Sequence, residues 1–195
     1  MSDSGNCYKV RLCAAQLGIA LQRHPTNILE GESRTAEFLS LNPNGKVPLL
    51  LLPSGEPLAE SNAMLLHLAE GSALLPAAGY QRSLVHQWLF FEQYSHERFI
   101  ATNRFWRHIL GDADTYADQI AANEPNGYAA LDVMEAELSR SDFLVPSGYS
   151  IADIALYAYT HVADQGGFDL TGYPAIRRWL TRVAGQPGHV RMLDS

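Results

Sequence analysis

The chain has 195 residues, of which 47% are hydrophobic and 18% charged, and its formal net charge is -7 at pH 7. These values are typical of a globular protein with a sizeable core, built as one domain or two small ones. The negative charge argues against broad binding to nucleic acid or to an anionic membrane, because both reward clustered lysines and arginines. The densest basic cluster, at 177–182, falls on one amphipathic helix and is interpreted as a solvated face.

Other patterns narrow the class of protein further. The longest wholly apolar run, at 47–52, contains a proline and is far shorter than the ~20 residues of a membrane span. No signal-peptide pattern is present. Cys7 and Cys13 point in different directions on one predicted helix, which disfavours a disulfide or a shared metal site. The seven histidines show no metal-type spacing. We therefore expect a cytoplasmic protein without a metal, a nucleic-acid partner or a membrane partner.

In the first 75 residues, the spacing of the apolar residues is helical in some segments and strand-like in others. Ser4, Gly5 and Asn6 precede an early helix, and such a start offers N–H groups and partial positive charge that suit a thiolate or a carboxylate. Ser61 is a predicted N-cap, and Gly71 a helix stop. The predicted elements are helices at 7–17 and 35–41, a strand at 19–28, a turn at 42–45, strands at 47–52 and 57–59, and a helix at 62–70.

Strand patterns are not found beyond the linker predicted at 76–80. Ser150 and Asp153 form a capping-box pattern in which Asp replaces Glu, and Tyr149 and Ile154 are spaced as its hydrophobic staple. The predicted helices lie at 81–109, 128–138, 150–163 and 175–184. The sequence thus predicts a small α/β unit at 1–75 followed by an all-helical unit at 81–195.

Four motifs stand at spacings shared with one known family. They are SGNCYKVRL at 4–12, NPNGKVPLL at 42–50, LAESNAMLLHLAEG at 58–71 and SIADI at 150–154. With them the chain resembles the glutathione S-transferase family, in its bacterial, serine-type form. The resemblance implies a thioredoxin-like glutathione-binding domain and an all-helical substrate domain. It also implies a homodimer that acts in detoxification, with glutathione as co-substrate and a small hydrophobic electrophile as the second substrate.

The resemblance further implies which residues hold the glutathione tripeptide. A cis bond between Val47 and Pro48 would let the Val47 backbone pair with the cysteinyl part of the ligand. Ser61, beside a helix N-terminus, would receive the γ-glutamyl carboxylate, and Glu60 would pair with the ammonium group. Lys46 would meet a ligand carboxylate. From the residues alone, a trans proline at a strand edge, a capping Ser61 and a solvated Lys46 remain alternatives.

Ser4 and Cys7 are the two candidates for the chemistry on sulfur. Ser4 matches the hydroxyl that serine-type members direct at the glutathione sulfur; such a donor lowers the thiol pKa from about 8.5 and favours the thiolate nucleophile. Cys7 matches the thiol with which cysteine-type members form mixed disulfides. A merely capping Ser4 and a merely buried Cys7 are the structural alternatives. We expect conjugation through Ser4, with exchange through Cys7 or a non-catalytic glutathione-binding role as the other hypotheses.

Two further expectations concern the electrophile pocket and the N-terminus. Tyr94, Arg98 and Asn103 on the long helix are candidates for lining the electrophile pocket. Only MSD precedes Ser4, whereas the family begins with a strand in the middle of the sheet. A start upstream, a sheet that closes differently, or a regulatory relative would each explain this difference, and we expect the first.

Overall fold

The computed structural model describes residues 1–194, which form two compact units. The first unit contains residues 1–72 together with the C-terminal stretch that begins at Pro187, and the second contains residues 73–186. The division therefore falls close to the predicted linker. The return of the C-terminal stretch to the first unit has no counterpart in the sequence prediction.

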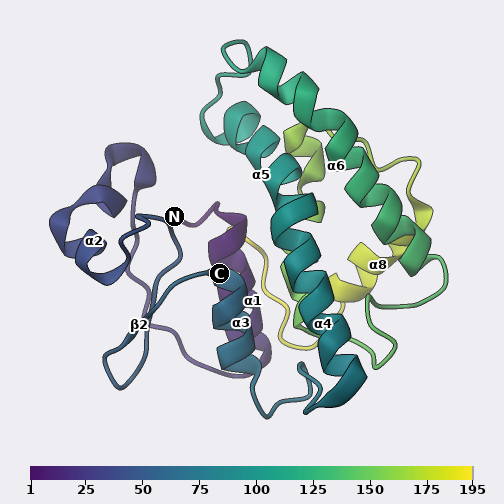
Figure 1. Cartoon of the computed structure of the whole chain (residues 1–195), viewed down its shortest axis with the longest axis horizontal. Helices are drawn as coiled ribbons and strands as arrows, with labels where there is room; N and C mark the ends of the chain where they lie inside the picture. Colours follow the sequence, from purple (N-terminus) through teal and green to yellow (C-terminus); the bar gives the residue numbers. More distant parts are fainter. Residues whose placement is uncertain (195) are drawn as a thin grey trace. The chain divides into compact units, whose positions relative to one another are not determined.

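The first unit combines helices with one short hairpin (Figure 1). Its strands pair antiparallel, with Leu50 opposite Leu58 and Leu51 opposite Pro57. Both strands lie within the segments predicted for them but are shorter. The elements in order are α1 (Gly5–Gln16), the 3-10 turns η1 (Ile28–Glu30) and η2 (Glu32–Arg34), α2 (Ala36–Leu41), β1 (Leu50–Leu51), β2 (Pro57–Leu58) and α3 (Ser61–Ala69).

The strand predicted over 19–28 is wrong. The structure has no regular element from residue 19 to Asn27, whose side chain caps η1 by accepting a hydrogen bond from the Leu29 N–H at 3.1 Å. A strand needs a neighbour for its backbone N–H and C=O groups. In the described part of the chain, the hairpin pairs only with itself. The apolar residues of the segment consequently stay partly open, and Ile19 is 38% exposed.

The helices α1 and α3 form the core of the first unit. Tyr8 and Leu12 of α1 and Met64 and Leu65 of α3 are fully buried, and the two helices pack against each other. The C-terminal stretch is fastened to α1, because the Tyr8 hydroxyl donates to the Val190 carbonyl oxygen at 2.7 Å. This contact explains why that stretch belongs to the first unit.

The regular elements of the second unit are all helical within its described residues, as predicted. Helical structure is continuous from residue 79 to residue 109, and α7 is buried along all ten of its residues. Helix α6 begins 11 residues earlier than predicted and contains Pro125. The elements are α4 (Gly79–Phe91), the π-helical η3 (Glu92–Glu97), α5 (Arg98–Arg104), the π-helical η4 (Phe105–Ile109), α6 (Ala117–Leu138), α7 (Ile151–Thr160), η5 (Ala163–Gly166) and α8 (Pro174–Ala184).

The predicted capping box begins α7 and extends into a buried network. Ser150 Oγ accepts from the Ala152 N–H at 3.2 Å, and Asp153 Oδ2 accepts from the Ser150 N–H at 3.0 Å. Asp153 Oδ1 accepts from the Leu144 N–H at 3.0 Å and from Trp179 Nε1 at 2.9 Å. Burial raises the pKa of Asp153 from 3.8 to about 6, although these hydrogen bonds act in the opposite direction. One carboxylate therefore joins α7 to α8 and to the loop before α7.

We expect Asp153→Asn to lower the free energy of unfolding by about 2–4 kcal/mol, because an amide N–H₂ would face donors that the carboxylate oxygens accept from. Chemical denaturation measures this loss. Because the pKa of Asp153 is raised on folding, its contribution to stability is present below about pH 4 and is lost as the pH rises through about 6. The variant should lack that pH dependence.

Asp118→Asn is the matched control, since Asp118 is exposed in the first turn of α6. Its effect should stay within about 0.5 kcal/mol. Equal losses in the two variants would show that the buried network does not stabilise the fold.

Candidate functional site

The N-terminal ends of α1 and α3 lie side by side. Ser61 is the first residue of α3, and its hydroxyl donates to Oδ1 of Asn6, the second residue of α1, at 3.0 Å. Lys9, one turn further along α1, places its Nζ 3.5 Å from Ser61 Oγ. Both helices direct the N–H groups of their first turns and their partial positive charge to this end, which favours an anion there.

Ser4 caps α1 at this same end. Its Oγ accepts from the Cys7 N–H at 3.3 Å, and its carbonyl oxygen accepts from the Tyr8 N–H at 2.9 Å. The capping role is thus confirmed. Within residues 1–194 no group accepts a hydrogen bond from the Ser4 hydroxyl, so this hydroxyl can still donate to a ligand while its oxygen caps the helix.

The two cysteines occupy different environments on α1. Cys7, in the first turn, is buried with 9% of its surface exposed, as its structural alternative predicts, and Cys13 is fully buried. Burial raises the pKa of the Cys13 thiol to about 12, which keeps it protonated and unreactive at neutral pH. Cys13 therefore belongs to the core, and Cys7 is the cysteine close to the candidate site.

Glu60, and not Ser61, stands at the cap position of α3. Glu60 has a φ of 66° and makes no side-chain cap, while Ser61 lies inside the helix. The predicted N-cap role of Ser61 is therefore wrong. The left-handed backbone at Glu60 turns the chain so that Ser61 begins the helix, and the Ser61 hydroxyl is directed to Asn6 instead. A non-glycine residue with such a φ is rare and is found preferentially at functional sites.

The predicted cis bond between Val47 and Pro48 is present. The preceding turn holds it, because Asn42 Nδ2 donates to the Lys46 carbonyl oxygen at 2.8 Å. Gly45 adopts a φ of 64°, and a Cβ there would displace the Arg34 guanidinium group and lie 3.0 Å from the Ser33 carbonyl oxygen. Lys46 itself is exposed.

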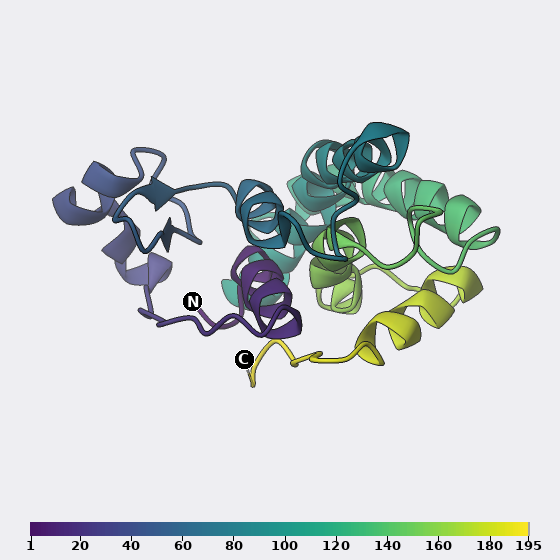
Figure 2. The ribbon, with the colours of Figure 1, turned by 90° about the horizontal axis from the view of Figure 1, so that it is seen from below.

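The structure brings together only part of the predicted set. Ser4, Cys7 and Ser61 share the common end of α1 and α3. Lys46 and the cis bond lie in the connection before the hairpin, and the hairpin and α2 lie to one side of the α1–α3 pair in both views (Figures 1 and 2).

The sequence placed Asn6 at the start of the helix but predicted no contact for its side chain, and it assigned no role to Lys9. The sequence could have indicated a special role for Lys9, because a lysine on the apolar face of a helix is unusual. Of the residues proposed for the electrophile pocket, Asn103 is 1% exposed and donates to the Ile120 carbonyl oxygen at 3.2 Å, so it belongs to the core. Tyr94 and Arg98 are exposed.

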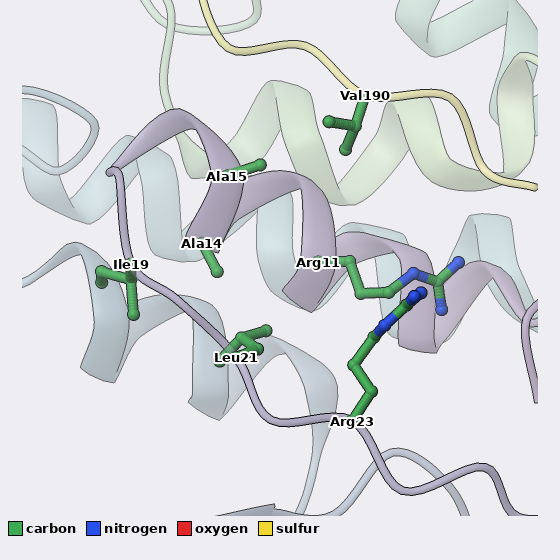
Figure 3. A pocket seen from close by; sticks show the side chains of 7 residues that line it. All are labelled: Arg11, Ala14, Ala15, Ile19, Leu21, Arg23 and Val190. Carbon is green, nitrogen blue, oxygen red and sulfur yellow. The ribbon is translucent and has the colours of Figure 1, made fainter. Parts of the chain in front are cut away.

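A separate pocket of about 170 Å³ lies in the first unit (Figure 3). The Arg11 and Arg23 guanidinium groups approach each other there, and burial is the main cause that lowers the pKa of Arg11. None of the predicted site residues lines it, so it is distinct from the common end of α1 and α3. Its lining residues are Arg11, Ala14, Ala15, Ile19, Leu21, Arg23 and Val190.

An α/β unit with a cis-proline before its hairpin, followed by a helical unit, defines the class of protein. The glutathione S-transferase N-terminal domain model matches residues 3–70, and the glutathione S-transferase C-terminal domain model matches residues 99–187. The chain belongs to the glutathione S-transferase family of enzymes, and its first unit is a thioredoxin-like domain with a sheet of two strands.

Individual relatives agree with this assignment. The chain is similar to a glutathione S-transferase from Pseudomonas fluorescens, with 51% identity, a TM-score of 0.97 and coverage of 99% of this chain and 96% of that one. It is 29% identical to the disulfide-bond oxidoreductase YfcG of Escherichia coli, over 93% of this chain and 87% of the relative. A glutathione transferase from Burkholderia graminis, with two glutathione molecules bound per subunit, is 26% identical, with a TM-score of 0.81 over 99% of this chain and 85% of that one.

Two further observations concern metal binding and membrane spans. The described residues contain no group of three or more histidine, cysteine, aspartate or glutamate side chains placed to hold a metal ion. Among residues 1–194, no helix is both long and apolar enough to cross a membrane.

We expect Gly45→Ala to lower the free energy of unfolding by about 1–3 kcal/mol, since it adds a tight approach to the Ser33 carbonyl oxygen, and loss of the Arg34 hydrogen bond to the Asn44 carbonyl oxygen, to the strain of a positive φ. Gly55→Ala is the matched control, because Gly55 also has a positive φ, of 97°, but has open space where its Cβ would be. Denaturant titrations should show the larger loss at Gly45. Equal losses would contradict a tightly held turn before Val47 and Pro48.

Proposed function

We propose that the protein is a cytoplasmic glutathione transferase that conjugates the glutathione thiolate to a small hydrophobic electrophile. The observation that carries the proposal is the meeting of the α1 and α3 N-termini at the Ser61–Asn6 hydrogen bond, beside the Ser4 hydroxyl. This end of the unit offers one hydroxyl for a sulfur and another for a carboxylate. Glutathione bound to the Burkholderia graminis relative supports the choice of ligand.

In this proposal, Ser4 controls the sulfur. Its hydroxyl donates to the glutathione sulfur, which together with the α1 N-terminus lowers the thiol pKa and releases the thiol proton to solvent. The thiolate then forms a bond to the electrophilic carbon. With an aryl halide, the carbon–halogen bond breaks and the halide leaves with its electron pair.

The remaining predicted residues would bind the tripeptide. Ser61 and the α3 N-terminus receive the γ-glutamyl carboxylate, while the exposed Glu60 pairs with the ammonium group. The backbone of Val47, turned by its cis bond to Pro48, pairs with the cysteinyl part of the ligand. Lys46, exposed in the turn before it, meets the other carboxylate of the ligand.

Glutathione-dependent disulfide exchange is the second candidate function. It is favoured by the similarity to the Escherichia coli oxidoreductase and by the place of Cys7 in the first turn of α1. The Cys7 thiolate would attack the glutathione sulfur of a mixed disulfide and release the other thiolate, which takes up a proton. A second glutathione thiolate would then attack the Cys7 disulfide, giving oxidised glutathione and the free Cys7 thiolate.

Ser4→Ala and Cys7→Ser separate the two functions when both activities are assayed in both variants. For conjugation of an aryl halide, we expect Ser4→Ala to lower kcat/KM by about 10²-fold at pH 6.5, because one donor to the thiolate is lost. Since that donor lowers the thiol pKa, the loss should shrink as the pH rises toward 9. Cys7→Ser should retain conjugation.

The converse pattern would favour exchange. Loss of disulfide-reductase turnover in Cys7→Ser, with conjugation absent from the wild-type protein, would replace conjugation by exchange as the function. Failure of the wild-type protein to bind immobilised glutathione would reject both.

We also propose that the protein is a homodimer, as the family resemblance implies. Phe90 and Tyr94 support this because each is 74% exposed and residues four positions apart share one helix face. Phe90→Lys should shift the sedimentation coefficient toward that of a monomer. Tyr80→Lys, at an equally exposed aromatic residue near the start of α4, is the control. A wild-type monomer would contradict the proposal.

A further inference from the structure

We propose that Lys9 is a positioning residue for recognition of the ligand's γ-glutamyl carboxylate, acting through the Ser61 hydroxyl. The inference rests on the proposed function, because it assumes that glutathione places this carboxylate at the start of α3. Lys9 would thus belong to the site without touching the ligand itself.

The geometry around Lys9 sets the direction of the hydrogen bonds. Lys9 is 0% exposed, and its Nζ lies 3.5 Å from Ser61 Oγ. An ammonium group can only donate, whereas a serine hydroxyl has one hydrogen to donate and lone pairs that accept. The Ser61 oxygen is therefore the acceptor from Lys9, and the Ser61 hydrogen must be directed to another group.

In the structure that other group is the amide oxygen of Asn6. Ser61 Oγ donates to Asn6 Oδ1 at 3.0 Å, so the three side chains form a directed chain from Lys9 through Ser61 to Asn6. A carboxylate is a stronger acceptor than an amide oxygen. When a ligand carboxylate arrives at the α3 N-terminus, the Ser61 hydrogen can move from Asn6 to the carboxylate without any change at Lys9.

Lys9 strengthens this contact in two ways. A hydroxyl that accepts from a cation becomes a better donor, because hydrogen bonds in a chain polarise one another. The buried ammonium group also adds positive charge beside two helix N-termini, where low polarisability of the surroundings makes electrostatic attraction to an anion stronger. A methionine would fill a similar volume without either effect, although burying a lysine is costly.

The chain also connects the two parts of the proposed site. Asn6 lies two residues after Ser4, in the first turn of α1. Transfer of the Ser61 hydrogen to a carboxylate removes one donor from the Asn6 amide oxygen. Binding at the start of α3 therefore changes hydrogen bonding at the start of α1, where the sulfur is proposed to lie.

The test compares two thiols in equilibrium binding and steady-state conjugation. One is glutathione, and the other is γ-aminobutyryl-cysteinyl-glycine, which has a hydrogen in place of the γ-glutamyl carboxylate. We expect Lys9→Met to raise the Kd and KM for glutathione by about tenfold with little change in kcat. The Kd for the analogue should change by less than about twofold, because no carboxylate is present to be recognised.

A double-mutant cycle tests whether Lys9 acts through Ser61. Lys9→Met should cost no further glutathione affinity in a Ser61→Ala background, since the intermediary hydroxyl is already missing. Arg23→Met is the control for loss of one positive charge, because Arg23 is exposed and lies outside the site. If Lys9→Met does not fold by circular dichroism, Lys9→Gln replaces it, and its glutathione affinity should also fall.

The outcomes distinguish this inference from the proposed function. If the wild-type protein does not bind glutathione, the proposed function fails. If the wild-type protein binds glutathione but Lys9→Met binds it equally well, or loses affinity for both thiols alike, the positioning role of Lys9 is overturned. Additive losses in the double-mutant cycle would also overturn it.

Discussion

The hydrogen bond from the Ser61 hydroxyl to Asn6 Oδ1 holds the N-terminal ends of α1 and α3 together. The candidate site depends on this contact, because it places the first-turn N–H groups of both helices, and the Ser4 cap, at one end of the first unit. Behind it the two helices pack against each other, with Tyr8 and Leu12 of α1 and Met64 and Leu65 of α3 fully buried. A polar contact at one end and an apolar core along the helices thus position the groups that would receive an anion.

The first unit gains its remaining order from turns rather than from a large sheet. Gly45 turns the chain before the hairpin, and Glu60 turns it after the hairpin, each with a positive φ. The C-terminal stretch is bound to α1 through Tyr8 and Val190. The second unit is organised around the buried α7 and the Asp153 network, so each unit has its own core and its own means of stability.

The proposed glutathione chemistry requires three features of the first unit: an anion site, a hydroxyl near a sulfur, and a backbone edge that pairs with the peptide. In the proposed site, Ser61, Ser4 and Val47 supply these groups, and Lys9 lies buried behind the Ser61 hydroxyl. Of the two proposed reactions, conjugation would dominate if Ser4, the cap of α1, controls the sulfur, and disulfide exchange if Cys7 in the first turn does. The same scaffold can serve either reaction, since both begin with a stabilised thiolate.

Local signals in the sequence determined the helices, the hairpin and the capping box at Ser150, because caps, turns and helical periodicity depend on neighbouring residues. The family motifs also indicated the cis bond before Pro48. The segment 19–28 was mispredicted as a strand because pairing depends on a distant partner, which local pattern does not reveal. The buried environment of Lys9, and its contact with Ser61, likewise required the tertiary structure, since only packing of α3 on α1 brings residues 52 positions apart within hydrogen-bonding distance.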